Sequence, residues 1–362
     1  MLLNNVFRKI EINFFAILLS KVLMDYYQYG TFISNKIAAF DLDNTLIQTK
    51  SKKRFPKDKD DWELINESIK SKLNKLYENK YCIVVFTNQK NLEKRMKRED
   101  FKNKLENIAK EIGVPMIFYF SMKNDYMRKP FTGMFEYHDK KFCSAVLLNL
   151  SFYVGDAWSK TECFSDSDLC FAQNCRLPFY KAKEFFSLDK PSVYSSICPS
   201  LSMDDNYVQN QIKLNSFILG LKYIFIISSP ASGKTTFCKK YLNGYMRLSK
   251  DDYNTPAKYR KIIQNNQDQK LVFDNTNSTV SARNQILSYL KNPVMIGYII
   301  RIIPKKETLY LNKYRHFISG GKIKLLPDVA IHTYYAHLKL PTGSNVFIIN
   351  SSWIYNLNEF YC

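Results

Sequence analysis

The sequence has no C-x-x-C pair and no long apolar run. Its eight cysteines lie singly along 362 residues, whereas a structural zinc site takes ligands at short, paired spacings. We therefore expect no zinc site and interpret the cysteines as reduced thiols of an intracellular protein. The apolar run at 14–19 is far shorter than the roughly 20 residues of a membrane span. Arg8 and Lys9 would suit a transit peptide, but the nearby acids Glu11 and Asp25 argue against one. No membrane role is expected.

Acidic residues are scarce relative to basic ones. The 53 Lys and Arg against 33 Asp and Glu leave a net charge of +20 and a pI near 9.4. Such an excess favours a polyanionic partner, above all nucleic acid. A coding bias toward lysine would produce the same excess without any partner, and the composition leaves both explanations open. Hydrophobic residues at 46% and aromatic residues at 15% exclude a mainly disordered chain.

The length and the alternation of elements predict two α/β domains. No internal repeat is visible. In the first half, strands are expected at 36–40, 81–86, 116–120 and 152–154, with helices over 62–77 and 99–112. In the second half, strands are expected at 223–228, 271–273 and 294–300, with helices from Lys234 and near 281–290. Each half should form a parallel sheet with helices on both faces.

The predicted boundaries follow from this alternation and from one polar stretch. Residues 189–210 are rich in Ser, Pro, Asp and Asn, which is typical of a linker. We therefore expect an unassigned extension over 1–35, a first domain over 36–190, a linker over 191–216 and a second domain over 217–362.

Two aspartates follow the first predicted strand, in the segment FDLDNT. Asp41 and Asp43 can both reach one pocket above the sheet, where open α/β folds bind ligands. One carboxylate there can attack phosphorus to give an acyl-phosphate, while a second acid protonates the departing oxygen and then activates water. Because nucleophile and phosphate are both anionic, a divalent cation is required. The pair alone is equally compatible with a solvated turn or a helix N-cap.

Later segments supply the other groups that this chemistry needs. Thr87 and Asn88, after the second strand, suit hydrogen bonds to a phosphoryl oxygen. Lys129 would provide a fixed positive charge, and Asp156 a metal ligand. Each has a structural alternative, as a turn residue, a surface charge or a loop acid. Their order along the chain resembles that in the haloacid-dehalogenase superfamily of aspartyl phosphatases.

A second chemical motif, SSPASGKTT at 228–236, follows the strand predicted at 223–228. In a G-x-x-x-x-G-K-[ST] loop, backbone N–H groups cradle ATP phosphates, the lysine neutralises them and the hydroxyl binds Mg²⁺. Ser228 stands where the first glycine is expected. The residues expected to contact ATP are Ser229, Pro230, Ala231, Ser232, Gly233, Lys234, Thr235 and Thr236, with Thr235 also on the metal.

The chain resembles eukaryotic polynucleotide kinase 3′-phosphatases over about 38–190 and 217–350. In the first half the match rests on FDLDNTLIQTKSKKRFPKDKDDW, FTNQ, RKP-x-x-GM, VGDA and SDSDLCFAQNCRLPFYKAKEFF. In the second half it rests on the P-loop, LSKDD, FDNTN, NKYRHF and LLPDVAIHTYY. The resemblance implies a haloacid-dehalogenase-like Rossmannoid phosphatase domain followed by a P-loop kinase domain with a parallel sheet.

In the phosphatase half, the resemblance implies that Asp41 is the nucleophile and Asp43 the acid/base. The phosphoryl-binding residues would be Thr87, Asn88, Arg128 and Lys129, and the Mg²⁺ ligands Asp41, the Asp43 carbonyl and Asp156. Asp168 matches the last acid of the family pattern, with no assigned duty. Asn44 stands where the family usually has Gly. Because Asn tolerates unusual backbone angles, we expect activity to survive that change.

In the kinase half, the resemblance implies that Asp251 is the general base for the 5′-hydroxyl. Asp252 beside it remains an alternative, and Asp251 could instead cap a helix. Arg315 would be a lid arginine that stabilises the transferring phosphoryl group, unless it lies on a solvated helix face. Arg283 matches a family arginine of unassigned role.

The resemblance implies a bifunctional enzyme that uses Mg²⁺ and ATP to leave 3′-hydroxyl and 5′-phosphate ends in DNA repair. RNA ends, an inactive kinase site or a small-molecule phosphatase fused to a metabolite kinase are the alternatives. We expect a monomer in the nucleus, with cytoplasm or mitochondrion as alternatives, and a DNA ligase or repair scaffold among its partners. Residues 1–35 are too few for the forkhead-associated domain of animal members, so recruitment through that domain is not expected.

Overall fold

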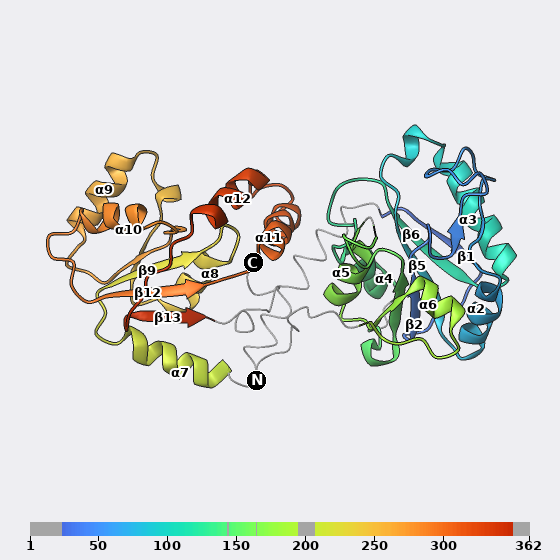
Figure 1. Cartoon of the computed structure of the whole chain (residues 1–362), viewed down its shortest axis with the longest axis horizontal. Coiled ribbons are helices and arrows are strands. Elements are labelled where there is room, and N and C mark those ends of the chain that lie inside the picture. The colour runs from blue at the N-terminus through green and yellow to red at the C-terminus, as the bar shows by residue number, and fades with distance from the viewer. Residues whose placement is uncertain (1–23, 143–144, 164, 195–206, 350–362) are drawn as a thin grey trace. The chain divides into compact units, whose positions relative to one another are not determined.

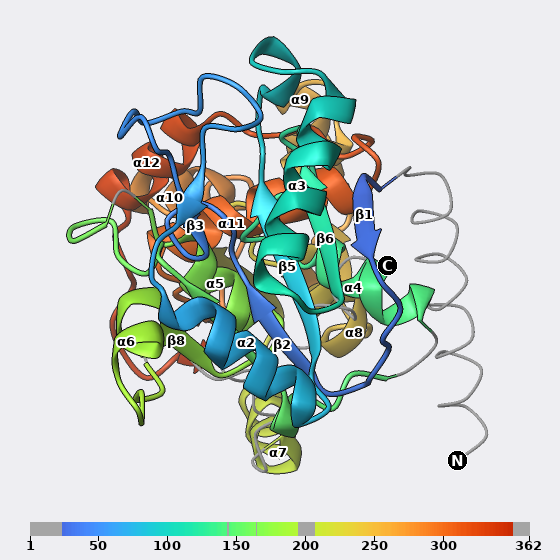
Figure 2. The same cartoon turned by 90° about the vertical axis from the view of Figure 1, so that its right-hand side faces the viewer.

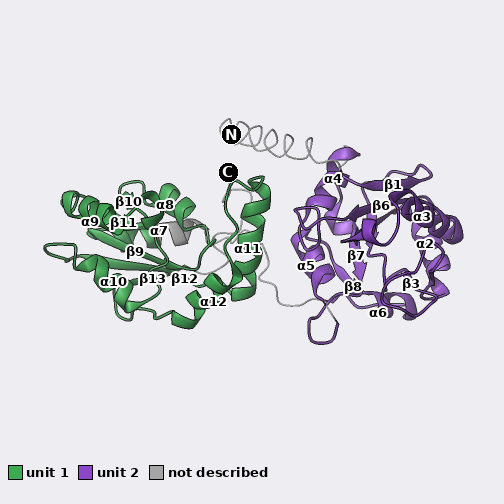
Figure 3. Cartoon of the chain, turned by 90° about the horizontal axis from the view of Figure 1, so that it is seen from above, with its two compact units in different colours: residues 1–12, 199–362 green, residues 13–198 purple. Residues whose placement is uncertain are grey.

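The computed structural model describes residues 24–142, 145–163, 165–194 and 207–349 (Figure 1). They divide into two compact units (Figure 3): the described residues before 195 belong to unit 2, and those from 207 onward belong to unit 1. The apolar run at 14–19 and the part of the predicted linker at 195–206 lie outside the described residues. Among the described helices, none combines the length and apolar character needed to cross a bilayer.

Unit 2 is built on a six-stranded sheet in the order β1-β6-β5-β2-β7-β8. These strands are β1 (Tyr26–Tyr29), β2 (Ile37–Phe40), β5 (Cys82–Asn88), β6 (Met116–Ser121), β7 (Phe152–Gly155) and β8 (Phe179–Lys181). All neighbours pair in parallel except β1, which is antiparallel to β6. β1 lies in the stretch expected to be an unassigned extension. Its tyrosines pack on both faces of the sheet, so residues 26–29 are part of unit 2.

Helices cover both faces of this sheet. One face carries α2 (Ser68–Glu78), α3 (Arg98–Ile112) and α6 (Ala182–Ser187), and the other α4 (Gly133–Lys141) and α5 (Ser167–Asn174). Figure 2 shows α2 and α3 in front of the strands. In β2, Ala38 and Phe40 face the first layer while Ile37 and Ala39 face the second. Burial on both sides explains why the strands are continuous apolar runs rather than alternating ones.

The helix predicted from residue 62 begins later than expected. Residues Glu63–Leu64 form β4, which pairs with β3 (Ile47–Gln48), and α2 starts only at Ser68. The Asp61 carboxylate accepts hydrogen bonds from the backbone of Ser51 and Lys57 and so fixes the loop that precedes β4. The helix predicted at 99–112 is α3, and it ends at Gly113, whose φ of +86° is a left-handed C-cap.

Unit 1 is built on a five-stranded, fully parallel sheet in the order β10-β11-β9-β12-β13. Its strands are β9 (Tyr223–Ser228), β10 (Met246–Leu248), β11 (Leu271–Phe273), β12 (Ile296–Arg301) and β13 (Val346–Ile349). Its helices are α7 (Tyr207–Ile218), α8 (Lys234–Tyr241), α9 (Pro256–Asn265), α10 (Val280–Leu287), α11 (Lys305–Ile318) and α12 (Asp328–His337). α7 and α8 pack on one face and α9 and α10 on the other. Single 3-10 turns occur at Leu92–Lys94, Leu148–Leu150 and Lys250–Asp252.

The end of the predicted linker is a helix. Residues 207–216 belong to α7, whose Leu214 is fully buried against the sheet of unit 1. The helix was missed because the polar stretch at 189–210, which favoured a linker, overlaps its first turn. In both units the predicted α/β class is confirmed.

Candidate active sites

The predicted phosphatase residues gather at the carboxyl edge of the sheet in unit 2. Asp41 follows β2, Thr87 and Asn88 end β5, and Asp156 follows β7. Since these strands are parallel and adjacent, their ends meet at one edge. A cavity of about 900 Å³ opens there. Its lining includes Asp41, Asp43, Thr87, Asn88, Arg128, Lys129, Asp156 and Asp168. The structure therefore brings together every residue that the sequence predicted for this site.

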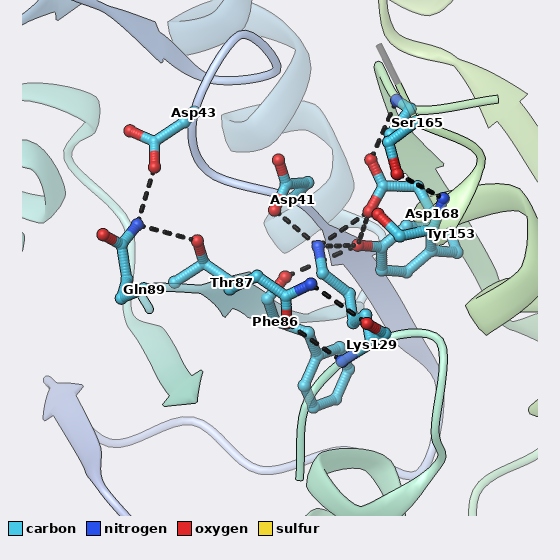
Figure 4. A network of polar contacts seen from close by, with 12 residues as sticks. Asp41, Asp43, Phe86, Thr87, Gln89, Lys129, Tyr153, Ser165 and Asp168 are labelled. Carbon is cyan, nitrogen blue, oxygen red and sulfur yellow. Dashed lines mark hydrogen bonds and ion pairs between the residues drawn. The ribbon is translucent and has the colours of Figure 1, made fainter. Parts of the chain in front are cut away.

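Lys129 lies at the centre of the site (Figure 4). Its ammonium donates to Asp41 Oδ1 at 2.5 Å, to Asp168 Oδ1 at 2.7 Å and to the Tyr153 hydroxyl at 2.8 Å. The side chain is buried. Burial alone would lower the pKa of Lys129, but the carboxylates of Asp168 and Asp41 hold it above its ordinary value. Lys129 is therefore a fixed positive charge.

A third carboxylate, that of Asp156, lies beside the two that contact the Lys129 ammonium. Oxygens of Asp41, Asp156 and Asp168 lie within 4.8 Å of one another. Burial, and then the neighbouring carboxylates, raise the pKa of Asp41 well above its usual range, although Lys129 opposes this. Burial and the charge of Asp168 raise the pKa of Asp156 to about 7. Crowded carboxylate oxygens with an excess of negative charge suit a hard divalent cation.

Asp168 thereby gains a role that the sequence left unassigned. Its second oxygen accepts the Ala157 N–H at 3.0 Å, and it comes so close to Gly155 that a Cβ there would lie 2.6 Å away. Glycine is therefore required at this position. Tyr153 was missed by sequence reasoning, because a tyrosine inside a strand resembles an ordinary core residue.

Asp43 has different neighbours from Asp41. Its Oδ2 accepts from Gln89 Nε2 at 2.6 Å, and Gln89 also contacts Thr87 Oγ1 at 3.0 Å (Figure 4). Asn44, the residue directly after Asp43, has a φ of +59°, the left-handed conformation for which Asn is well suited. Two carboxylates in unlike environments can divide two roles between them. Gln89 was not predicted as a site residue, although it ends the FTNQ segment.

Asn88 and Arg128 differ in what they do. Asn88 Oδ1 accepts the Lys129 N–H at 2.9 Å, and its Nδ2 donates to the Lys129 carbonyl at 3.1 Å. This amide positions Lys129, a contact that the sequence did not predict. Arg128 lines the cavity, and its buried Nη1 has no hydrogen-bond partner among the described residues. An unpaired buried cation gains most from an anionic ligand.

In unit 1, the predicted strand–loop–helix context of the P-loop is present. β9 ends at Ser228, the loop covers 229–233, and α8 begins at Lys234. The residues expected to contact ATP thus occupy the loop and the first turn of α8. Lys234 Nζ donates to the Ser229 carbonyl at 2.7 Å. Burial lowers the pKa of Lys234 to about 8, with the charge of Asp274 opposing that shift.

Asp274 completes the P-loop site. It follows β11, and its Oδ2 accepts from Thr235 Oγ1 at 2.7 Å and from Arg247 at 2.8 Å. Its Oδ1 is buried and has no partner among the described residues. A P-loop hydroxyl beside a strand-end carboxylate is how such enzymes hold Mg²⁺, so these residues fit the ion. The FDNTN segment is part of the family resemblance, but no role was predicted for its aspartate, Asp274. An acid at a parallel-strand end was the available signal.

The structure distinguishes the two candidate general bases. Asp252 forms an ion pair with Arg247 at 2.5 Å. Asp251 is exposed and makes no ion pair within the described part of the chain. The Ser249 hydroxyl accepts its backbone N–H, which caps the short turn that carries both acids. Asp251 is therefore the freer carboxylate, as the general-base role requires.

The two predicted arginines differ in setting. Arg315 lies on α11, close enough to Lys234 for its charge to lower the pKa of that lysine. Its charge therefore acts on the P-loop lysine. Arg283 is buried and donates to the Asn277 carbonyl at 2.9 Å, while the Asn277 amide bonds the carbonyls of strands β9 and β11. Arg283 therefore supports the DNTN segment.

Known proteins that are similar to this chain include polynucleotide phosphatases and kinases. The family model described as polynucleotide kinase 3 phosphatase matches residues 36–186. A bifunctional polynucleotide phosphatase/kinase of Schizosaccharomyces pombe is 28% identical over 87% of this chain and 78% of its own length. A protein of Acanthamoeba polyphaga mimivirus, provisionally named a bifunctional polynucleotide phosphatase/kinase, is 30% identical over 84% of this chain and 81% of its own. A 20.8 kDa protein of Autographa californica nuclear polyhedrosis virus is 47% identical over 42% of this chain and 87% of its own.

Proposed function

The chain belongs to the family of bifunctional polynucleotide phosphatase/kinases, and on that premise we propose that it heals strand ends in DNA repair. Unit 2 removes a 3′-phosphate and unit 1 phosphorylates a 5′-hydroxyl with ATP. The products, a 3′-hydroxyl and a 5′-phosphate, are the ends that a ligase joins. The observation that carries this proposal is the presence in one chain of both the Lys129–carboxylate cluster and a P-loop with its own acid, Asp274.

In the phosphatase, Asp41 attacks the phosphorus, so that a bond forms from its carboxylate oxygen while the bond to the 3′-oxygen breaks. Asp43, oriented by Gln89, donates a proton to the departing oxygen and then takes one from the water that hydrolyses the acyl-phosphate. Lys129 and Arg128 bind the phosphoryl oxygens. Mg²⁺, which we assign to Asp41, Asp156, Asp168 and the Asp43 carbonyl, supplies further charge neutralisation when bound.

In the kinase, Asp251 accepts the proton of the 5′-hydroxyl as its oxygen bonds to the γ-phosphorus and ADP departs. Lys234 and Arg315 stabilise the charge on the transferring group. Thr235 and Asp274 are the residues that would hold Mg²⁺.

The surroundings of the phosphatase cavity favour a polynucleotide over a small metabolite. Besides the catalytic residues, its lining includes the cationic side chains Lys52, Lys53, Arg54, Arg95 and Lys104. Among them is the exposed ring of Phe55, with the Arg95 guanidinium 4.7 Å from its centre. Basic and aromatic side chains together suit a single strand. We propose DNA as the substrate, with RNA ends as the alternative that the assay below tests.

The test uses a nick that carries a 3′-phosphate and a 5′-hydroxyl, made in DNA and in RNA, with and without ATP. Asp41→Asn should abolish phosphate release and leave 5′-phosphorylation intact, while Lys234→Ala should do the reverse. Each variant is thus the folding control for the other. If either substitution removed both activities in a folded protein, the two-site proposal would be wrong. If the RNA nick were healed faster than the DNA nick, RNA and not DNA would be the substrate.

A further inference from the structure

The P-loop of unit 1 contains one residue whose backbone conformation is costly for a side chain. Ser228, which stands in place of the first glycine, is the last residue of strand β9, but Ala231 within the loop has a φ of +58°. Residues with a side chain disfavour this left-handed conformation. Such a backbone persists only when neighbouring groups hold it. The question is which groups do so here.

A chain of three hydroxyls connects the P-loop to the helices that follow β12. Ser229 Oγ lies 2.8 Å from Thr308 Oγ1 on α11, and Thr308 Oγ1 lies 2.7 Å from the Tyr335 hydroxyl on α12. Tyr335 in turn donates to the Ile303 carbonyl. Ser229 and Thr308 are both buried, so neither hydroxyl has water as a substitute partner. We call Ser229, Thr308 and Tyr335 the hydroxyl chain.

The hydroxyl chain is connected to two cationic residues of the predicted nucleotide site, Lys234 and Arg315. The Ser229 carbonyl accepts a hydrogen bond from the Lys234 ammonium. A shift of Ser229 would therefore move the group that holds this ammonium in place. Thr308 and Arg315 are both on α11, seven residues and two helical turns apart, and thus on the same side of the helix. In addition, Arg301 at the end of β12 donates to the Ser232 carbonyl. The loop is therefore held from β12 and α11 together.

We propose that Thr308 is a positioning residue for ATP. Its hydroxyl, held by Tyr335, keeps Ser229 and hence the P-loop backbone in the shape that receives the phosphates, and supports a loop in which Ala231 has a left-handed backbone conformation. This inference rests on the proposed kinase function. It concerns only nucleotide binding, because Thr308 does not touch the reacting atoms.

The experiment compares Thr308→Val, which keeps the shape but removes the hydroxyl, with Thr308→Ser, which keeps the hydroxyl. ATP affinity of the full chain is measured by calorimetry, and KM for ATP and kcat in the kinase assay. Thr308→Val should weaken ATP binding and raise its KM roughly tenfold, since it leaves the buried Ser229 hydroxyl unpaired. Thr308→Ser should stay within about twofold of wild type, because the hydrogen bond is retained.

Two controls isolate the effect. Tyr335→Phe should weaken ATP binding, whereas Tyr334→Phe should not, because the hydroxyl of this neighbour on α12 makes no hydrogen bond with the described residues. Phosphatase activity should be unchanged in all four variants.

Several results would overturn the proposal. Equal losses in Thr308→Val and Thr308→Ser would show that Thr308 acts only by packing. Wild-type affinity in Thr308→Val, or no ATP binding by wild type, would reject it outright. If wild type bound ATP yet phosphorylated no 5′-hydroxyl, the proposed function would fail, while the affinity series would still decide the role of Thr308.

Discussion

At the residue scale, the two aspartates after β2 have different hydrogen-bond partners, and these partners suit them to different roles. Asp41 contacts the Lys129 ammonium, whereas Asp43 contacts the neutral amide of Gln89. The contact with Lys129 places Asp41 where a phosphoryl group would be bound. The contact with Gln89 leaves Asp43 free to exchange a proton with a leaving group or a water. This division supports assigning Asp41 as nucleophile and Asp43 as acid/base.

The division predicts different behaviour of the two alanine variants toward an activated aryl phosphate. Asp41→Ala should show no turnover, because nothing remains to bond phosphorus. Asp43→Ala should form a phospho-enzyme and then stall, since a good leaving group needs little protonation but the water still needs a base. Rapid acid quench with labelled phosphate should find the label on Asp41. Wild-type turnover with label never bound to protein would instead indicate direct attack by water.

A second prediction at this scale concerns the kinase acids. Asp251→Asn should lower kcat for 5′-phosphorylation by about 10²–10⁴-fold, the usual contribution of a general base. Asp252→Asn should have a clearly smaller effect, because its partner Arg247 retains Asp274. The measurement is kcat at saturating ATP, with phosphatase activity as the folding control. A larger loss in Asp252→Asn would exchange the two roles.

Sequence reasoning located the charged groups better than their partners. Asp41, Lys129, Asp156 and Lys234 belong to motifs whose chemistry shows in the residue types themselves. Gln89 was not assigned, because a glutamine in a turn gives no chemical signal until its contact with Asp43 is known.

At the element scale, the central parallel strands were predictable, whereas the edges were not. β2, β5 and β9 are continuous apolar runs because both faces are buried. The edge strands β1 and β13 were missed, since each is only four residues long and is mostly only partly buried. The start of α2 was misplaced because the bonds of Asp61 depend on residues ten positions away. Such non-local contacts leave no periodic pattern.

One element, α4, predicts a pH dependence of stability. Its His138 is buried, and its Nδ1 lies 3.1 Å from the Tyr119 hydroxyl. Burial lowers the pKa of His138 to about 4, from 6.5. Between these values the unfolded chain binds a proton that the folded chain does not. This group should therefore remove about 1.4 kcal/mol of stability for each pH unit below about 6.5, until about pH 4.

The measurement is the free energy of unfolding of unit 2 within the full chain at pH 7, 6 and 5. It is obtained from denaturant titrations in which loss of phosphatase activity reports the unfolding of this unit. His138→Phe should lower stability at pH 7, because the Tyr119 hydroxyl loses its partner, yet show a shallower fall toward pH 5. Parallel curves for the two proteins would mean that His138 does not carry this dependence.

At the scale of the whole molecule, the net charge of +20 has two explanations, a polyanionic substrate or a coding bias. They differ in where the charge must lie. A substrate requires cations at the site, and the lining of the phosphatase cavity includes Lys52, Lys53 and Arg95. A bias would spread lysines over surfaces such as the exposed side of α2, where Lys75 lies. Both distributions occur, so binding measurements must decide between them.

Salt dependence provides that measurement. With Asp41→Asn, which prevents turnover, the logarithm of the affinity for a single-stranded 3′-phosphate end should fall linearly with the logarithm of salt concentration. The slope should be about 0.7 per phosphate contacted, because each contact releases condensed counterions. A second substitution, Lys53→Gln, should reduce the slope by about 0.7, the contribution of one phosphate contact. Lys75→Gln in its place should leave the slope unchanged, because Lys75 does not line the cavity. A flat dependence, or equal effects of the two lysines, would show that the excess charge is compositional and does not serve the strand.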